Sequence, residues 1–366
     1  MLRGSEAFEA TVAGSHQRVV KAEAWLAGRR IASDLPLVQA SVSGDDSRFV
    51  RRTATLAFQE DPHFPGEALG KTLARPGCEV RVWSGVAIAG RPEFLPVFWG
   101  LSSAPVRSWP DRRVTVSSQD KALRVARHRF PRPRSSSVGM TVSQQIEALV
   151  RESIPRVRFV DESNGLGSTV VPRVVWERDR NDAVTKLAAS VGCETFFRPD
   201  GAWVLRQVPS LRGIPTRRLR EGVSLVDASE TTDWEAVRNH WVCIAERADG
   251  LALVGESADT VATSPTCVTG PLGTLTAFYS SSLFTTSAQC TAAAVGFRRR
   301  SQGARVTVDF SALAHPGTEA GDRVDVTADG GTHRLILDSF DLDLFAATMT
   351  GRGRTATTLA EIEDAS

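Results

Sequence analysis

Short bursts of alternating apolar and polar residues, separated by Gly, Pro and Asp, fill the first third of the chain. In residues 52–59, for example, Ala54, Leu56 and Phe58 would line one side of a strand. Residues 19–31 predict a hairpin with its turn at 27–29. Apolar spacing with a period of two, repeated at short intervals, indicates a small antiparallel barrel or sandwich.

The pattern changes after residue 128. Residues 127–137 contain two prolines and a serine run, which predict an extended linker. Thr141 then begins a T-x-x-Q capping box, followed by apolar residues at helical spacing up to Pro155. A second helix, capped by Asp179 or Asn181, ends at Gly192. With a strand at 156–160 and a hairpin at 194–207, this segment predicts a small α+β domain.

Strands return in the last third of the chain, and one helix interrupts them. The predicted strands are 223–228, 237–245, 304–310, 322–327, 333–344 and 347–351, and the helix is 287–300. Asp329-Gly330-Gly331 is a typical hairpin turn. These patterns predict a mainly β protein with an inserted α+β domain.

The same patterns give the domain boundaries. The predicted units are an N-terminal β-barrel at 1–128, completed by a returning strand near 217–230; an inserted α+β domain at 129–215; a linking β/helix segment at 231–300; a C-terminal β-barrel at 301–356; and a solvated tail at 357–366.

Composition narrows the class of protein further. The chain has 44 basic and 42 acidic residues, so its formal net charge of +2 provides no broad attraction to nucleic acid or to an anionic membrane. The N-terminus lacks the apolar core of a signal peptide, and no apolar run reaches the ~20 residues that span a bilayer. We therefore expect a soluble protein at synthesis.

Cysteine usage indicates free thiols. The five cysteines are odd in number, far apart and without zinc-site spacing, so we expect them to be reduced and mostly buried. They are Cys78, Cys193, Cys243, Cys267 and Cys290.

Local motifs of catalysis are missing from the sequence. The segment from Gly66 to Thr72 resembles a phosphate-binding loop, but three residues separate its glycines where four are needed, so a turn is favoured. No GxSxG or HExxH motif occurs. Six histidines are scattered singly along the chain, although a catalytic triad could still assemble in space. They are His16, His63, His128, His240, His315 and His333.

Two charged clusters have alternative interpretations. Asp338, Asp341 and Asp343 could bind calcium or act as an acid/base pair, but alternation with Phe340 and its neighbours favours the wet face of a half-buried strand. The arginines of residues 127–134 could contact DNA or an acidic partner, but a solvated linker is favoured because stacking aromatics are scarce there. We therefore expect no catalytic residue, no cofactor and no metal site.

The order of several short segments resembles a known family. These segments are residues 16–25 with Gly28-Arg29-Arg30, the run Val175-Trp176-Glu177-Arg178-Asp179-Arg180 with Gly192-Cys193-Glu194, Val237-Arg238-Asn239-His240, Tyr279-Ser280-Ser281, and Pro316-Gly317 with residues 321–326. Together they resemble tail proteins of actinobacterial phages and prophages, related to the baseplate-hub superfamily and to the N-terminal hub region of siphophage tail-associated proteins. Each segment is a turn-plus-strand pattern, and their order over about residues 15–355 carries the resemblance.

The resemblance implies a non-enzymatic homotrimer located in the virion tail and assembled in the bacterial host cytoplasm. Each copy would carry two similar barrels, so that a trimer forms a pseudo-sixfold ring between the hexameric tube, or the distal tail ring, and the tip. Its partners would be a distal tail or tube protein, the tape-measure protein and tip or fibre proteins, with DNA only in transit through the lumen and no membrane span. Many relatives continue into a hydrolase or fibre domain, whereas this sequence ends at Ser366.

Two alternative functions stay open. The chain could be another tail or injection-system component, such as a distal tail ring or spike-base protein. It could also be a β-rich cell-wall hydrolase, which would require two carboxylates, or a nucleophile and a base, in one cleft.

Overall fold

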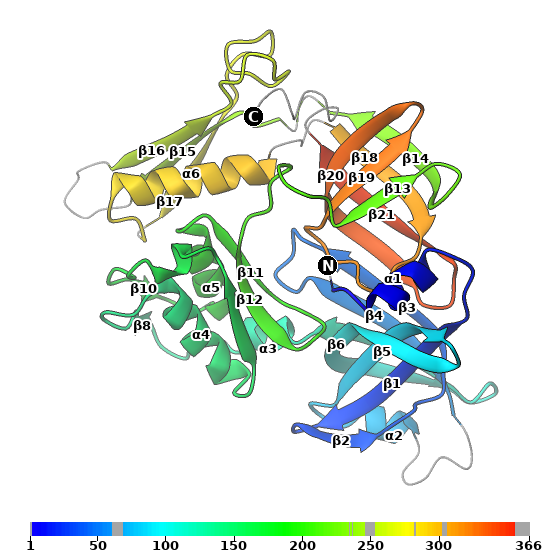
Figure 1. Ribbon diagram of the computed structural model, residues 1–366. Helices are drawn as coiled ribbons and strands as arrows, with labels where there is room; N and C mark the ends of the chain where they lie inside the picture. Colours follow the sequence, from blue (N-terminus) through cyan, green and yellow to red (C-terminus); the bar gives the residue numbers. More distant parts are fainter. Residues whose placement is uncertain are drawn as a thin grey trace.

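The fold is that of a mainly β protein in three parts (Figure 1). The computed structural model describes residues 2–60, 69–233, 235, 237–245, 253–281, 283–301 and 306–355. Two groups of strands lie together on the right of Figure 1, an α+β unit lies at lower left, and a small sheet covered by one helix lies at upper left. No helix within these ranges is long and apolar enough to cross a membrane.

The N-terminal strand group is entirely antiparallel. Its strands are β1 (Arg18–Leu26), β2 (Arg29–Ala32), β3 (Leu37–Asp45), β4 (Arg52–Gln59), β5 (Glu79–Ile88), β6 (Arg91–Ser108) and β7 (Arg113–Asp120). They pair in the order β2-β1-β5-β6-β7-β4-β3. Three short helices, α1 (Glu6–Val12), α2 (Leu69–Leu73) and α3 (Ala122–Arg127), accompany the strands and were not predicted.

The alternation of apolar and polar residues explains which sides of these strands are buried. Ala54, Leu56 and Phe58 of β4 are buried as predicted and Thr55 is exposed, although Ala57 on the opposite side of the strand is buried as well. The hairpin predicted for residues 19–31 is also confirmed as β1 and β2. Its turn uses left-handed backbone at Gly28, a conformation that costs glycine little.

The C-terminal strand group contains the final hairpin. Its strands are β13 (Arg217–Arg220), β14 (Leu225–Thr232), β18 (Val306–Leu313), β19 (Arg323–Ala328), β20 (Gly331–Asp343) and β21 (Thr348–Thr355). They pair in the order β13-β19-β20-β21-β18-β14, with only β13 and β19 parallel. The turn predicted at Asp329 and Gly330 joins β19 to β20, and both residues have positive φ.

Strands near 217–230 do not complete the N-terminal group, contrary to prediction. β13 and β14 instead pair with β19 and β18 of the C-terminal group. Leu219 lies opposite Val326, Leu225 lies opposite Ala312, and all four side chains belong to one hydrophobic core. An alternating pattern specifies which face of a strand is buried, but it does not specify the strand's partner.

One strand pair, β20 with β3, joins the two groups into one sheet and is called the seam below. The long strand β20 pairs with β19 through its first half and with β3 through its second, from Ser339 opposite Asp45 to Asp343 opposite Ser41. One hydrophobic cluster contains side chains of both groups. The predicted mainly β, antiparallel class is confirmed, whereas closure of each group into a barrel stays a prediction.

The α+β unit follows the N-terminal group. It contains β8 (Arg134–Ser135), α4 (Val142–Ser153), β9 (Arg158–Glu162), the 3-10 turn η1 (Leu166–Ser168), β10 (Val175–Trp176), α5 (Arg180–Ala189), β11 (Cys193–Phe197) and β12 (Ala202–Gln207). β11, β12 and β9 form a sheet, and β8 pairs with β10. The predicted capping box of Thr141 and Gln144 is present, whereas Asp179 stands at the start of α5 without a capping hydrogen bond.

The third part is a two-layer unit. β15 (His240–Ala245) lies between β16 (Val254–Ala258) and β17 (Thr276–Ser281), and α6 (Ser287–Ser301), predicted at 287–300, packs on this sheet. Gly296 of α6 meets Gly192 of the α+β unit so closely that a Cβ on Gly296 would lie 2.8 Å from the Gly192 Cα. Two glycines thus allow the two units to contact through their backbones.

Candidate functional site

The segment between β18 and β19 lies at the centre of the molecule. Residues 314–322 are buried along their whole length, which is unusual for a connection between strands. Arg52 of β4 donates to the Thr318 carbonyl (2.9 Å), and Arg206 of β12 donates to the Ala320 carbonyl (3.1 Å). This segment, called the junction segment below, therefore connects both strand groups with the α+β unit.

Arg52 is the main cross-link to the junction segment. Its Nη1 donates to the Val97 carbonyl (3.0 Å), which belongs to a bulged position of β6, and its Nη2 lies 3.8 Å from a carboxylate oxygen of Glu319. The guanidinium also lies over the Phe340 ring, 5.3 Å from its centroid. Burial lowers the pKa of Arg52, and the nearby Glu319 carboxylate opposes that shift.

A second buried ionic contact joins the N-terminal group to the α+β unit. Glu194 of β11 accepts from Arg51 (2.9 Å) and from Arg206 (2.7 Å). Both guanidinium groups lie over the Phe196 ring, at 4.2 and 4.5 Å from its centroid. Removing one member of such a buried pair leaves an uncompensated charge, so these contacts fix how the parts are placed.

Two titratable groups at the junction have strongly shifted pKa values. Burial raises the pKa of Asp120 to about 7, although its carboxylate accepts from the backbone N–H groups of Arg52 and Ala122 (both 2.8 Å). Burial and the neighbouring Arg217 lower the pKa of His315 to about 4. The Gly317 N–H donates to the His315 Nδ1 (3.0 Å), and Glu9 lies 3.0 Å from its Nε2. Because each group is buried and held by protein partners, the arrangement suits cohesion more than proton transfer to a substrate.

The three aspartates near the last hairpin do not converge. Asp338 pairs with Arg354, Asp341 accepts from the Ser43 hydroxyl, and Asp343 accepts from the Phe345 N–H. Asp341 is exposed between buried neighbours, as the predicted wet face of a strand requires. Among the described residues, no group of three or more His, Cys, Asp or Glu side chains could hold a metal ion.

The histidines lie apart from one another. His63 is outside the described residues. The other contacts are His16 with the Gly14 carbonyl, His128 with Ser153, His240 with Thr276 and Glu256, His315 with Glu9, and His333 with Glu230. None of these contacts, which cover the described histidines, joins one histidine to another.

The remaining candidates are structural. Of the loop-like motif, residues 66–68 are outside the described residues, and Leu69 and Leu73 are buried in the short helix α2. All five cysteines are free and buried, as predicted. Burial raises the pKa of Cys78 to about 11 and those of Cys193 and Cys243 to about 12, so these thiols stay protonated at neutral pH.

The arginine-rich segment 127–134 is exposed at most positions, as predicted for a solvated linker, but Phe130 and Arg134 anchor it. Phe130 is buried and stacks on Trp176, with ring centroids 6.3 Å apart, and Arg180 lies 4.4 Å from the Phe130 ring centroid. Arg134 pairs with Glu152 at 2.6 Å. The aromatic residue that was too isolated for stacking on bases serves instead to fix the segment on the α+β unit.

An exposed polar surface was missed at the sequence level. Opposite residues on β14, β18, β21, β20, β3, β4 and β7 form one unbroken row across both strand groups. The row is Asp227, Ser311, Thr350, Asp341, Ser43, Thr53 and Gln119. We call this row, with the next outward residues of the same strands, the polar sheet face. A hollow of about 350 Å³ lies on its C-terminal half.

No protein-family model and no curated protein sequence matches this chain. Solved structures do match its fold. A tail protein from Neisseria meningitidis MC58 matches with a TM-score of 0.63 and 15% identity, over 92% of this chain and 96% of that one. The 43 kDa tail protein of prophage MuSo2 from Shewanella oneidensis has a TM-score of 0.59, 12% identity, and coverage of 92% and 98%.

A third solved structure with a matching fold is also a tail protein. Prophage tail protein gp18 from Listeria monocytogenes EGD-e has a TM-score of 0.54 and 9% identity, over 94% of this chain and 97% of that one. This chain therefore has the fold of phage tail proteins. The predicted likeness to tail proteins is confirmed at the level of fold, whereas these three sources give no support to an actinobacterial origin.

Proposed function

We propose that this protein is a structural hub of a phage or phage-like tail, which connects the tail tube or the distal tail ring to the tip. The observation that carries the proposal is the match in fold to phage tail proteins along nearly the whole length of both chains. The buried junction supports it, because a connector that transmits force between tube and tip needs parts that keep fixed relative positions.

The proposed assembly is a homotrimer that forms a pseudo-sixfold ring. Each copy contributes two strand groups joined by β20 and β3, so three copies would present six groups around one axis. Each group would close into a small barrel. The division at 1–128, 129–215, 231–300 and 301–356 stays a prediction, except that the strands near 217–230 are assigned to the C-terminal group.

The proposed neighbours are a distal tail or tube protein, the tape-measure protein and tip or fibre proteins, with DNA in transit through the central lumen. The mechanism is steric and mechanical and uses no catalytic residue, cofactor or metal. Obligate interfaces of roughly 2,000 Å² or more hold such a ring together without chemistry. The protein would be assembled in the host cytoplasm and located in the virion tail.

An exposed arm offers a contact for this assembly. The hairpin of β6 and β7 ends at Trp109, which is 79% exposed, and Arg107 lies 5.1 Å from its ring centroid. Trp and Arg are among the side chains enriched at the energetic centres of interfaces.

Imaging of purified particles tests the proposal. We expect three copies of this chain at the end of the tail tube. Six copies would indicate a distal tail ring protein instead, and a stable monomer with a substrate cleft would contradict a structural role.

A further inference from the structure

Two of the five buried cysteines lie in one small core. Cys243 of β15 and Cys290 of α6 are fully buried and belong to the cluster between α6 and its sheet (Figure 1). Cys78 and Cys193 belong to the clusters of other parts, and Cys267 lies in the segment between β16 and β17. All five cysteines are within the described residues, so this pair is the one that shares a core.

A glycine brings helix α6 close to the sheet beside this pair. Gly255 of β16 is the antiparallel partner of Cys243. A Cβ on Gly255 would lie 2.7 Å from the Cys290 Cβ and closer still to the Thr291 backbone nitrogen. Directly paired residues of an antiparallel sheet point to the same face, with their Cβ atoms ~4.5–5.5 Å apart. The Cys243 side chain therefore points to α6 next to the position where Cys290 meets the sheet.

The register of α6 along β15 agrees with this placement. The Phe297 ring stacks on Trp241, with ring centroids 5.1 Å apart, and Cys290 lies over the partner of Cys243, so α6 runs antiparallel to β15. From the stacked pair, seven residues of helix lead back to Cys290 over about 10.5 Å, and two residues of strand lead to Cys243 over about 7 Å. The two cysteines are thus offset by about 4 Å along the common direction. The Cβ atoms of a disulfide lie ~3.5–4.5 Å apart, so a bond between them needs little movement of α6.

The two thiols are stable while they stay covered. Burial raises the pKa of Cys290, and burial together with the adjacent Cys290 raises the pKa of Cys243 to about 12. The Cys290 Sγ donates to the Leu253 carbonyl at 3.7 Å, which is a weak contact. Because the thiolate is the reactive form, neither sulfur reacts until α6 lifts from the sheet. Such local openings are expected where few buried side chains hold an element, and this cluster contains six buried residues among those described.

We infer that Cys243 and Cys290 form a disulfide when the folded protein meets an oxidising medium, and that the bond fixes α6 on its sheet. The oxidant is a low-molecular-weight disulfide such as oxidised glutathione. One protein thiolate attacks it and forms a mixed disulfide, with release of one glutathione thiol. The second thiolate then displaces the other glutathione thiol and closes the protein disulfide, and the two thiol protons leave on the released glutathiones. Two protein thiols are oxidised and one glutathione disulfide is reduced.

The bond would stabilise this unit of the chain. A disulfide acts mainly by restricting the unfolded chain, and the effect grows with the length of the loop that it closes. The loop here runs from residue 243 to residue 290 and contains β16, β17 and the start of α6. Protein thiols stay reduced in a cytosol and are oxidised outside it. The time of oxidation, after release of particles from the host, rests on the proposed function, whereas the pairing itself does not.

Oxidation of the purified chain tests the inference. The folded protein is incubated with oxidised glutathione, the remaining thiols are alkylated, and the disulfide is located by peptide mass spectrometry. We expect the number of free thiols to fall from five to three, and a linked peptide pair to contain Cys243 and Cys290. The melting temperature should rise by roughly 5 °C and return to its starting value with dithiothreitol.

Two variants assign the bond to this pair. Cys290→Ala should keep all of its thiols under the same treatment, with no rise in melting temperature. Cys193→Ala, at a buried cysteine of the α+β unit, should lose two thiols as the native protein does. Five free thiols in the treated native protein, a disulfide between any other pair, or glutathione retained at one cysteine would each overturn the inference. An unchanged melting temperature of the linked protein would overturn the role of the bond in fixing α6.

Discussion

Arg52 gives the sharpest test of the junction. Arg52→Met keeps most of the aliphatic volume but removes donors to the Val97 and Thr318 carbonyls and the cation beside Glu319. A buried acceptor left without its donor costs about 1–3 kcal/mol, and a broken buried ion pair costs about 3–5 kcal/mol. Because these effects overlap at one side chain, we expect a loss of roughly 4–6 kcal/mol in the free energy of unfolding.

The measurement is denaturant unfolding followed by tryptophan fluorescence. Arg48→Met is the matched control, because Arg48 is 68% exposed and forms an ion pair with Asp45, which predicts a loss below about 1 kcal/mol. The loss for Arg52→Lys should lie between those for Arg52→Met and Arg48→Met, since one ammonium group replaces the several donors of the guanidinium group. If the free energy of unfolding of the Arg52→Met variant is within about 1 kcal/mol of that of the Arg48→Met variant, the buried junction does not hold the parts together.

Three further predictions concern other contacts. Arg180 is buried and donates to the Leu149 carbonyl and to Glu152, so Arg180→Met should lower the free energy of unfolding by roughly 3–5 kcal/mol. In the same denaturation assay, Lys186→Met, at an exposed position, should change the free energy of unfolding by less than about 0.5 kcal/mol. Because the folded-state pKa of His315, about 4, lies below its ordinary value of 6.5, its stabilising contribution is present above pH 6.5 and is lost as pH falls through 4. Lowering the pH from 7 to 4 should therefore reduce the free energy of unfolding of the native protein by about 3 kcal/mol more than that of the His315→Gln variant. An equal fall in the free energy of unfolding for both proteins would contradict this. Gly44→Ala would place its Cβ 2.3 Å from the Phe340 ring at the seam, so thermal unfolding should show a loss of about 1–3 kcal/mol, and an unchanged melting temperature would contradict the tight packing there.

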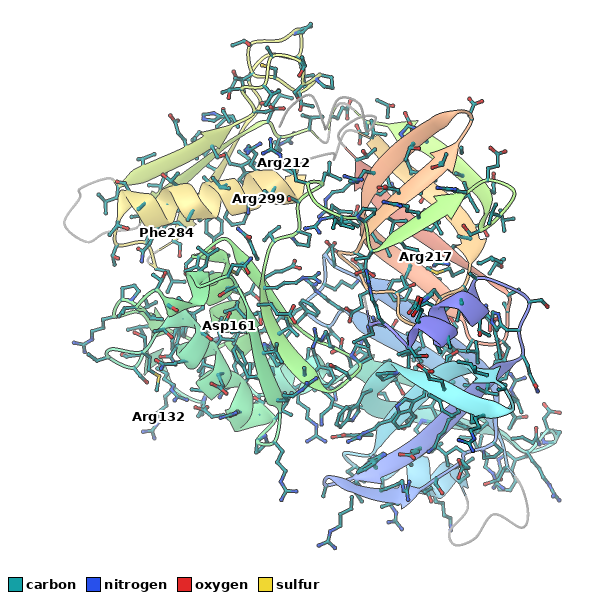
Figure 2. The ribbon with its side chains drawn as sticks, in the orientation of Figure 1. Arg132, Asp161, Arg212, Arg217, Phe284 and Arg299 are labelled. Atoms are coloured by element: carbon teal, nitrogen blue, oxygen red, sulfur yellow. The ribbon has the colours of Figure 1, made fainter. Side chains whose placement is uncertain are left out.

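The burial of charge at the centre of the molecule has a consequence for assembly. Figure 2 places Arg217 on β13, close to the boundary of the two strand groups, and burial lowers its pKa to about 10. Such groups are stable only while their partners stay in place. We therefore expect the parts of one copy to be rigidly placed before copies associate, which suits a ring whose interfaces have fixed geometry.

Local elements were predictable from local signals. The capping box of Thr141 and the glycine turn at residue 330 each act within a few residues, so they could be read along the chain. Alternation likewise gave the buried side of β4, with Leu56 and Phe58 inward. Helix α1 was missed although Ser5 caps it, because its seven residues present only two buried side chains.

The candidate site was not predictable in the same way. Arg52 and Glu319 are far apart in sequence, and neither has a pattern that marks a buried ion pair. Phe130, within the arginine-rich segment, gave no local sign of its contact with Trp176. The polar sheet face had a weak signal, the Ser, Thr and Asp residues at every second strand position, but the signal is the same for any solvated strand.

The sequence by itself determined the mainly β class, most strand and helix positions and the absence of familiar catalytic motifs. Alternation, capping and turn chemistry are properties of neighbouring residues, and they act before the chain is compact. Only the tertiary structure decided that β13 and β14 join the C-terminal group, that β20 and β3 make one sheet, and that residues 314–322 are buried among paired charges. Those outcomes depend on which surfaces meet, because strand edges accept many partners and a buried charge is stable only beside its counter-charge.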